Sequence, residues 1–314
     1  MYALFLKSLC ITIATLSLLG CNRSDDDKLT LATGPLGGSW YPLGGAIKAA
    51  VEAGSAEFKV RVTPGAGIAN VKAIDSGKID LAIGNSVSTV DGIKGKPPFK
   101  RPTKNVCNVA TFYPQYFQII ALEKSNIVSI NDIEGKSLAG QSPGNTAEAI
   151  TKHILEVNGF SYDDLAQVNF GSYTDSIALM KDGNADVFTL GTMIPSGAVM
   201  DLASVRQIKL INIGDSTLSK LRLINPGYSR AYIPKNTYPN QKEQVKTVGY
   251  ATHLIGRCDL ENKIIYDLVA SIYKNLDDLG SITTAMSKLT PVKMSINIGV
   301  PMHPGASMWY EQNE

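Results

Sequence analysis

A glycine-rich segment near the start of the chain has the residue types to bind an anion. Residues 31–50, "LATGPLGGSWYPLGGAIKAA", begin like a strand, turn through a loop and continue as a helix. Gly34, Gly37 and Gly38 let backbone N–H groups approach a ligand closely, and the first helical turn leaves further N–H groups without internal partners. Such an arrangement favours an anion. The alternative is that these glycines only turn the chain.

A second segment of the same type predicts that the chain is built from two related halves. Residues 136–150, "KSLAGQSPGNTAEAI", again indicate a strand, a loop of Gly, Ser, Pro and Asn, and a helix. Residues 73–86 and 179–192 also match: each ends a helix at glycine, places an aspartate (Asp80, Asp186) after it and enters an apolar strand. Continuously apolar strands are typical of parallel sheets covered on both faces. This weak repeat predicts an α/β clamshell of two lobes, each a mixed sheet flanked by helices, with helix N-termini around a shared cleft.

Two strand-like segments are the expected connections between the lobes. They are residues 116–125, "YFQIIALEKS", and residues 229–236, "SRAYIPKN". On this interpretation lobe one comprises residues 28–121 and 230–314, and lobe two comprises residues 122–229.

The N-terminus predicts export. A basic residue, Lys7, precedes the apolar run "SLCITIATLSLL", which makes residues 1–20 a signal peptide. The stretch Leu18-Leu19-Gly20-Cys21 resembles a bacterial lipobox, so we expect Cys21 to be lipidated and residues 21–27 to form a tether. Ordinary secretion with an unmodified Cys21 is the alternative. The expected location is the periplasm or cell surface, attached to the membrane through the N-terminal lipid.

Composition excludes several classes of function. Cleavage after residue 20 leaves 29 Lys and Arg against 28 Asp and Glu, so nothing indicates a nucleic-acid partner. The three histidines are far apart, and no nucleophile motif, metal-ligand pattern or cofactor motif occurs. We therefore expect no enzyme activity, no cofactor and no metal. Cys107 and Cys258 either form a disulfide or remain two buried thiols.

Several ordered segments resemble the signature segments of TAXI-class solute receptors of TRAP transporters, and the resemblance spans nearly all of the mature chain. The segments are "GPLGGSWYPLGGAI", "PGAGIANVKAIDSGKIDLAIGNS", "FYPQ", "DIEGKSLAGQSPGNTAEA", "DGNADVFTLGTMIP" and "PMHPGA". The resemblance implies a type II periplasmic-binding-protein fold, and a receptor that delivers a small carboxylate, such as a glutamate-like amino acid or a dicarboxylate, to an ion-gradient-driven TRAP permease.

The resemblance also implies positions for the solute contacts. The contact positions of the family's first loop correspond to Ser39, Trp40 and Tyr41. Those of its later segments correspond to four groups of residues: Gly65, Ala66 and Asn70; Asn85, Ser86 and Val87; Tyr113, Pro114 and Gln115; and Pro143, Gly144, Asn145 and Thr146. Several positions depart from the family pattern: Val87 stands where the family has aspartate, and Gln115 where it has glutamate. The candidate ligand-binding residues are Gly38, Ser39, Trp40, Tyr41, Gly67, Asn70, Asn85, Ser86, Tyr113, Gly144, Asn145, Thr146, Gly191 and Pro195.

Each candidate also has a purely structural interpretation. Ser39, Asn145 and Thr146 stand at expected helix starts, where such residues act as caps. Asn70 and Asn85 are amides beside glycine that could hold turns. The aromatic residues Trp40, Tyr41 and Tyr113 could be core or hinge residues. His303 could be part of a C-terminal turn. The basic loop 94–104 could be a solvated loop rather than a surface for the permease or anionic head groups.

Two other functions fit the same fold. One is a binding lipoprotein of an ATP-driven ABC importer, of the sulfonate or thiamine-precursor type. The other is a sensory binding lipoprotein that feeds a signalling partner.

Overall fold

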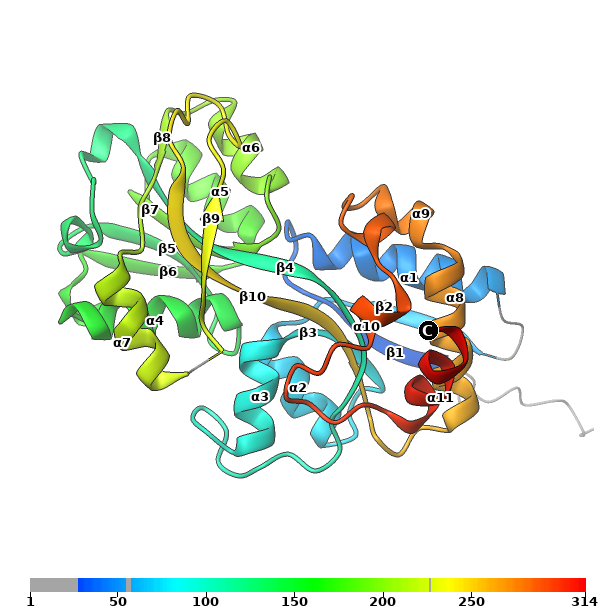
Figure 1. Ribbon diagram of the computed structural model, residues 1–314. Helices are drawn as coiled ribbons and strands as arrows, with labels where there is room; N and C mark the ends of the chain where they lie inside the picture. The colour runs from blue at the N-terminus through cyan, green and yellow to red at the C-terminus, as the bar shows by residue number, and fades with distance from the viewer. Residues whose placement is uncertain (1–27, 55–57, 226) are drawn as a thin grey trace, which may run out of the picture.

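One mixed sheet of ten strands runs through both lobes of the molecule (Figure 1). The computed structural model describes residues 28–54, 58–225 and 227–314, so the expected signal peptide, Cys21 and tether lie outside the described residues. The strands are β1 (Lys28–Ala32), β2 (Lys59–Thr63), β3 (Leu81–Asn85), β4 (Cys107–Leu122), β5 (Ser137–Gln141), β6 (Gln167–Gly171), β7 (Val187–Thr192), β8 (Ile208–Leu210), β9 (Ser229–Ile233) and β10 (Val245–Gly256). Their order is β2-β1-β3-β10-β4-β7-β5-β6, with β8 paired to β4 and β9 paired to β10.

Helices cover both faces of this sheet. They are α1 (Trp40–Gly54), α2 (Gly67–Asp75), α3 (Ser86–Lys94), α4 (Thr146–Asn158), α5 (Tyr173–Asp182), α6 (Gly197–Ala203), α7 (Asp215–Ile224), α8 (Asn262–Lys274), α9 (Leu276–Gly280), α10 (Pro291–Met294) and α11 (Pro304–Asn313). Short 3₁₀ turns are η2 (Glu123–Ser125), η3 (Ile130–Ile133), η4 (Tyr162–Asp164) and η5 (Met286–Lys288). No helix within the described residues is long and apolar enough to span a bilayer.

The two lobes repeat the same strand arrangement, as the sequence repeat predicts. In lobe one, β1 is parallel to both β2 and β3. In lobe two, β5 is parallel to both β6 and β7. Each lobe therefore places its first strand between its second and its third. The predicted two-lobed α/β fold is confirmed.

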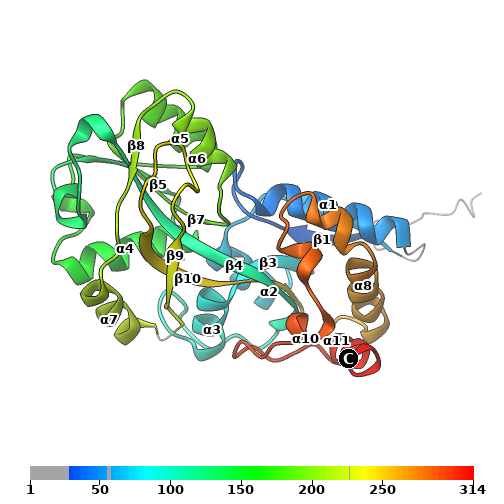
Figure 2. The ribbon, with the colours of Figure 1, turned by 45° about the horizontal axis from the view of Figure 1, so that its top comes forward.

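Two long antiparallel strands, β4 and β10, connect the lobes (Figures 1 and 2). Strand β4 contains most of the expected connection at 116–125, whereas the expected return at 229–236 is wrong. Strand β9 pairs with the lobe-two end of β10, with Ile233 opposite Val245. Both side chains pack with Phe188 of β7 in the core of lobe two. The chain returns to lobe one along β10, so the expected start of the second part of lobe one at residue 230 is too early.

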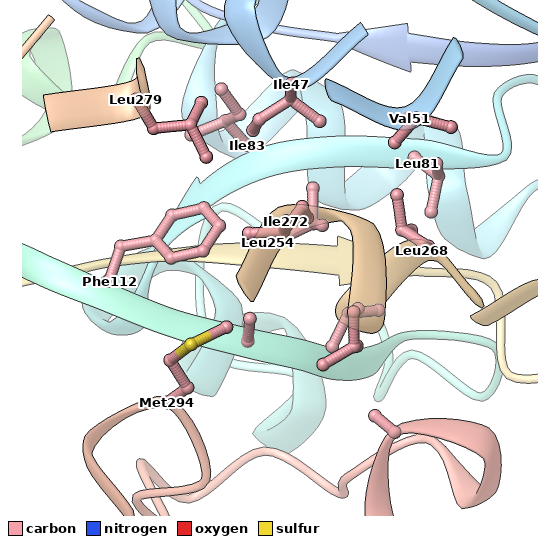
Figure 3. Close-up of a cluster of buried hydrophobic side chains, with 14 of the residues drawn as sticks. Ile47, Val51, Leu81, Ile83, Phe112, Leu254, Leu268, Ile272, Leu279 and Met294 are labelled. Atoms are coloured by element: carbon pink, nitrogen blue, oxygen red, sulfur yellow. The ribbon is translucent and has the colours of Figure 1, made fainter. Parts of the chain in front are cut away.

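Each lobe has a core on both faces of its sheet. In lobe one, Ile47 and Val51 of α1 and Leu268 of α8 pack over β3 and β10 (Figure 3). Helix α2 covers the opposite face. In lobe two, α4 and α7 cover one face, and α5 and α6 cover the other. Full burial of a Leu or Ile side chain contributes about 1.5–3 kcal/mol, so these layers hold each helix firmly against the sheet.

A disulfide joins the start of β4 to the segment that follows β10. Cys107 and Cys258 have their Cα atoms 5.1 Å apart, and both belong to lobe one. Of the two alternatives that the sequence leaves open, the structure contains the bonded one.

Candidate functional site

A cavity lies between the lobes at the carboxyl ends of their parallel strands. It encloses about 330 Å³ of empty space, part of it open to solvent. Its lining residues are Pro35, Gly38, Ser39, Trp40, Gly67, Asn85, Gln115, Asn145, Thr146, Ala147, Tyr173, Gly191, Thr192 and Tyr250. All of these side chains are neutral, and they come from both lobes and both connecting strands.

Five helices begin at this cavity, because each follows a parallel strand that ends there. They are α1, α2 and α3 of lobe one and α4 and α5 of lobe two. The first N–H groups of a helix have no partner within the helix, and its N-terminus carries a partial positive charge of about half a unit. The arrangement therefore concentrates hydrogen-bond donors and positive potential without a charged side chain in the cavity wall.

Two of these helices begin with an asparagine cap that also lines the cavity. Asn85 Oδ1 accepts a hydrogen bond from the Ser88 N–H at 3.0 Å, and Asn145 Oδ1 accepts one from the Ala147 N–H at 2.8 Å. Both side chains are at least nine-tenths buried. Capping and lining the cavity are thus compatible roles for the same amide.

Hydrogen bonds across the cavity hold the lobes together. Asn85 Nδ2 donates to Thr146 Oγ1 at 2.6 Å, and Ser88 Oγ lies 2.7 Å from the same hydroxyl. Ser39 Oγ of lobe one lies 2.9 Å from Thr192 Oγ1 of lobe two. A side chain at Gly67 would collide with the Thr146 hydroxyl, so this position requires glycine for the lobes to meet.

Aromatic side chains form the rest of the wall. The Tyr173 hydroxyl donates to the Gly191 carbonyl at 2.9 Å and accepts from the Gly191 N–H at 3.1 Å. Burial raises the pKa of Tyr173 and of Tyr250, so both rings stay neutral. The Trp40 indole N–H is buried and has no hydrogen-bond partner among the described residues. Such rings combine apolar contact with a polar tip, as small-molecule sites commonly require.

The cavity brings together part of the predicted set. The predicted residues that line it are Gly38, Ser39, Trp40, Gly67, Asn85, Asn145, Thr146 and Gly191. Those that do not line it are Tyr41, Asn70, Ser86, Tyr113, Gly144 and Pro195.

Three of the residues outside the cavity have structural roles in lobe one. Asn70 Nδ2 donates to the Thr33 and Ile83 carbonyls at 2.7 and 2.9 Å, so this amide holds a turn to the sheet. The Ser86 hydroxyl accepts from the Ala251 N–H at 3.1 Å. Tyr113 lies in the core of lobe one, where burial raises its pKa to about 12.

The other three lie beside the cavity without lining it. Tyr41 turns outward and is 39% exposed, so Trp40 alone of the two aromatics forms a wall. Gly144 has a φ of 95°, which glycine adopts without strain, and its carbonyl accepts from the Ala69 N–H across the lobes. Pro195 follows a cis peptide bond after β7.

Sequence reasoning left several lining residues out of the predicted set. They are Pro35, Gln115, Ala147, Tyr173, Thr192 and Tyr250. Of these, Gln115 is a position that the family resemblance marks, although the candidate set does not include it. Thr192 follows Gly191 directly, and Tyr173 begins a helix after Gly-Ser, so both carry the same signal as the predicted residues. Tyr250 lies on β10, which was not expected to connect the lobes, so no local signal marked it.

Two further observations concern residues away from the cavity. His303 caps α11, with its Nδ1 accepting from the Gly305 N–H at 3.1 Å, which fits the predicted turn. Across residues 28–54, 58–225 and 227–314, no group of three His, Cys, Asp or Glu side chains could hold a metal ion.

Several solved structures share this fold. PhnD1 from Prochlorococcus marinus in complex with methylphosphonate has a TM-score of 0.53 and 15% identity, over 83% of this chain and 91% of that chain. A binding protein of an ABC phosphonate transporter from Pseudomonas aeruginosa has a TM-score of 0.52 and 12% identity, over 82% and 78%. The alkanesulfonate-binding protein SsuA from Xanthomonas axonopodis pv. citri bound to MOPS has a TM-score of 0.50 and 13% identity, over 92% and 84%.

At these identities the likeness shows the fold, which is that of periplasmic solute-binding proteins. A sequence-family model described as the NMT1-like family matches residues 31–313, which is nearly all of the part that the structure describes. The chain therefore belongs to the NMT1-like family.

Proposed function

We propose that this chain is an extracytoplasmic solute-binding protein that captures a small organic oxyanion between its lobes and passes it to a membrane permease. One observation carries the proposal: helix N-termini from both lobes meet at a cavity lined by neutral side chains. Each N-terminus stabilises an anion by about 0.3–1 kcal/mol when exposed, and by up to about 2 kcal/mol when partly buried. Several together hold an anion without an arginine.

The narrower proposal is that the oxyanion is a carboxylate. The resemblance of the signature segments to TAXI-class receptors supports a carboxylate. The structural neighbours are described with a phosphonate and a sulfonate buffer instead. Carboxylate, phosphonate and sulfonate groups all present anionic oxygen atoms to backbone N–H donors. Binding of an oxyanion is therefore better supported than the choice of a carboxylate.

The partner permease has two candidates. The structural neighbours support an ABC importer, since one is named as a component of an ABC phosphonate transporter. The signature segments support a TRAP permease instead. Of these two partners we favour the ABC importer, because the structural neighbours support it. Reconstitution with the permease encoded beside this gene distinguishes them: uptake that needs ATP inside the vesicle supports an ABC importer, and uptake driven by an ion gradient alone supports TRAP.

A ligand screen tests the proposed binding. Native mass spectrometry of freshly purified protein identifies any solute that stays bound, and a thermal-shift screen of carboxylates, sulfonates and phosphonates finds the class. We expect a hit that calorimetry confirms and that NMR shows to be unchanged after incubation. Turnover of the hit, or no binding by any oxyanion, contradicts the proposal.

A matched pair of variants on α4 tests whether the solute binds in the cavity. Asn145→Ala should weaken the hit by about 1–3 kcal/mol, because it removes an amide from the cavity wall. Asn158→Ala, at the opposite end of the same helix, should leave affinity unchanged. Equal effects of the two variants contradict this location for the site.

The lipid anchor is proposed from the sequence alone. If Cys21 carries lipid, Cys21→Ser should move the protein from the membrane fraction to the soluble fraction. Unchanged fractionation would contradict the lipobox interpretation.

A further inference from the structure

We infer that the solute carries an anionic group but no ammonium group, so that the site rejects amino acids and aminosulfonates in favour of their deaminated counterparts. The inference rests on the proposed function and narrows its solute class. It excludes the glutamate-like amino acids that the sequence resemblance includes. Three independent features of the cavity support it.

The first feature is the sign of the potential. The N-termini of α1 to α5 all point their partial positive charge at the cavity. The field that attracts a carboxylate therefore repels an ammonium group on the same small molecule. An amino acid would need a compensating anion close to its nitrogen.

The second feature is where the acidic side chains of these helices point. The first turns of α1, α2 and α3 contain no acidic residue, whereas α4 has Glu148 and α5 has Asp175. Glu148 Oε1 accepts from the Tyr162 hydroxyl at 3.2 Å, and Glu148 lines a separate hollow together with Ile68 and Lys72 of α2. Asp175 Oδ2 accepts from the N–H and hydroxyl of Ser172 at 2.9 and 2.7 Å. Both carboxylates are engaged away from the cavity.

The third feature is that several acceptors in the wall are already occupied by hydrogen bonds from the protein itself. Asn85 Oδ1, Asn145 Oδ1 and the Gly191 carbonyl each accept a hydrogen bond from the protein itself. The Thr146 hydroxyl accepts from Asn85 Nδ2. By contrast, the Trp40 indole N–H is a donor without a partner among the described residues. The wall therefore offers an unpartnered donor to a solute, and its occupied acceptors cannot compensate the cost of burying an ammonium group.

Matched pairs of compounds test the inference by calorimetry. The pairs are pyruvate and alanine, 2-oxoglutarate and glutamate, ethanesulfonate and taurine, and methylphosphonate and aminomethylphosphonate. In every pair that binds, we expect the amino compound to bind at least tenfold more weakly. An amino compound that binds as tightly as its partner overturns the inference while supporting the proposed function. If no oxyanion binds at all, the proposed function fails and the inference fails with it.

A variant that adds an acid to the wall provides the reverse test. Gln115 lines the cavity and is 2% exposed, so Gln115→Glu places a carboxylate there with little change in shape. We expect the variant to bind the deaminated anion more weakly and to reduce its preference over the amino compound at least tenfold. Gln167→Glu, on the exposed edge strand β6, makes the same charge change away from the cavity and should leave the preference unchanged. If Gln115→Glu folds by circular dichroism and keeps the wild-type preference, the inference is wrong.

Discussion

At the residue scale, a buried histidine connects the site to the strand that returns between the lobes. His253 of β10 is fully buried, with its Nε2 2.8 Å from Thr89 Oγ1 and its Nδ1 2.9 Å from Asn108 Oδ1. Burial lowers its pKa to about 3, and a contact with the Asn85 backbone opposes this shift. The ring is therefore neutral, and it supports the backbone of a residue that lines the cavity.

This histidine should make the protein sensitive to acid. Its pKa is lower in the folded chain than the ordinary 6.5, so below pH 6.5 the unfolded chain binds a proton that the folded chain does not. Stability is then complete above pH 6.5 and falls toward pH 3, by about 1.4 kcal/mol per pH unit. Urea unfolding at pH 7 and pH 5 should show that His253→Gln loses about 2 kcal/mol less than the wild type over this interval. Equal losses in the two proteins would contradict the assignment.

The sequence could predict cavity residues only where local chemistry marks them. Asn145 follows glycine at a helix start, and it both caps α4 and lines the cavity. Its contact with a solute stays a prediction. Asn70 has a similar local pattern, yet its amide is consumed by two carbonyls of lobe one. The difference lies in which backbone carbonyls the fold brings near each amide. A pattern of neighbouring residues contains no information on that.

At the element scale, the repeated aspartates have a physical explanation. Asp80 precedes β3 and accepts from the Thr30 N–H of β1 at 2.8 Å. Asp186 precedes β7 and accepts from the Ser137 N–H of β5 at 3.1 Å. In each lobe the carboxylate ties the start of the third strand to the first strand. The aspartate that follows the helix-ending glycine in each half therefore marks the pairing of the third strand with the first. This shared role explains why the pattern correctly predicted that the two halves are related.

Two adjacent glycines in α1 should respond oppositely to substitution. A side chain on Gly44 would collide with the Thr33 methyl group, whereas one on Gly45 meets nothing within 4 Å. Gly44→Ala should lower the free energy of unfolding by about 1–3 kcal/mol, because the helix must move off the sheet. Gly45→Ala should raise it by about 1 kcal/mol, because alanine favours the helix. Urea unfolding of both variants measures this, and a change of the same sign in both would contradict the packing of α1.

At the scale of the whole molecule, the return connection was the main error of sequence reasoning. Strand β10 contains buried Thr247, Thr252 and His253, so its pattern is less apolar than that of a typical buried strand. The expected 229–236 segment has a clear strand pattern, and it does form β9, which lies within lobe two. Local pattern predicts that a strand exists. Which lobe it joins depends on long-range pairing, and the local pattern does not determine it.

Closure of the lobes should depend on hydroxyl groups that meet across the cavity. Thr146→Val removes the hydroxyl that bonds Asn85 and lies beside Ser88. The closed form then loses about 1–3 kcal/mol relative to an open form in which water reaches these groups. The solute found by screening should bind more weakly by the same amount, because it selects the closed form.

Thr151→Val, five residues further along α4, is the matched control for this closure. The Thr151 hydroxyl bonds Ala147 and Thr189 within lobe two, so its loss should lower stability without changing closure. Small-angle scattering with calorimetry measures both effects. For the wild type and Thr151→Val, solute should reduce the radius of gyration at similar concentrations, whereas Thr146→Val should require more solute. If Thr151→Val shifts the transition as far as Thr146→Val does, the two variants act through general stability, and the contacts between the lobes do not control capture.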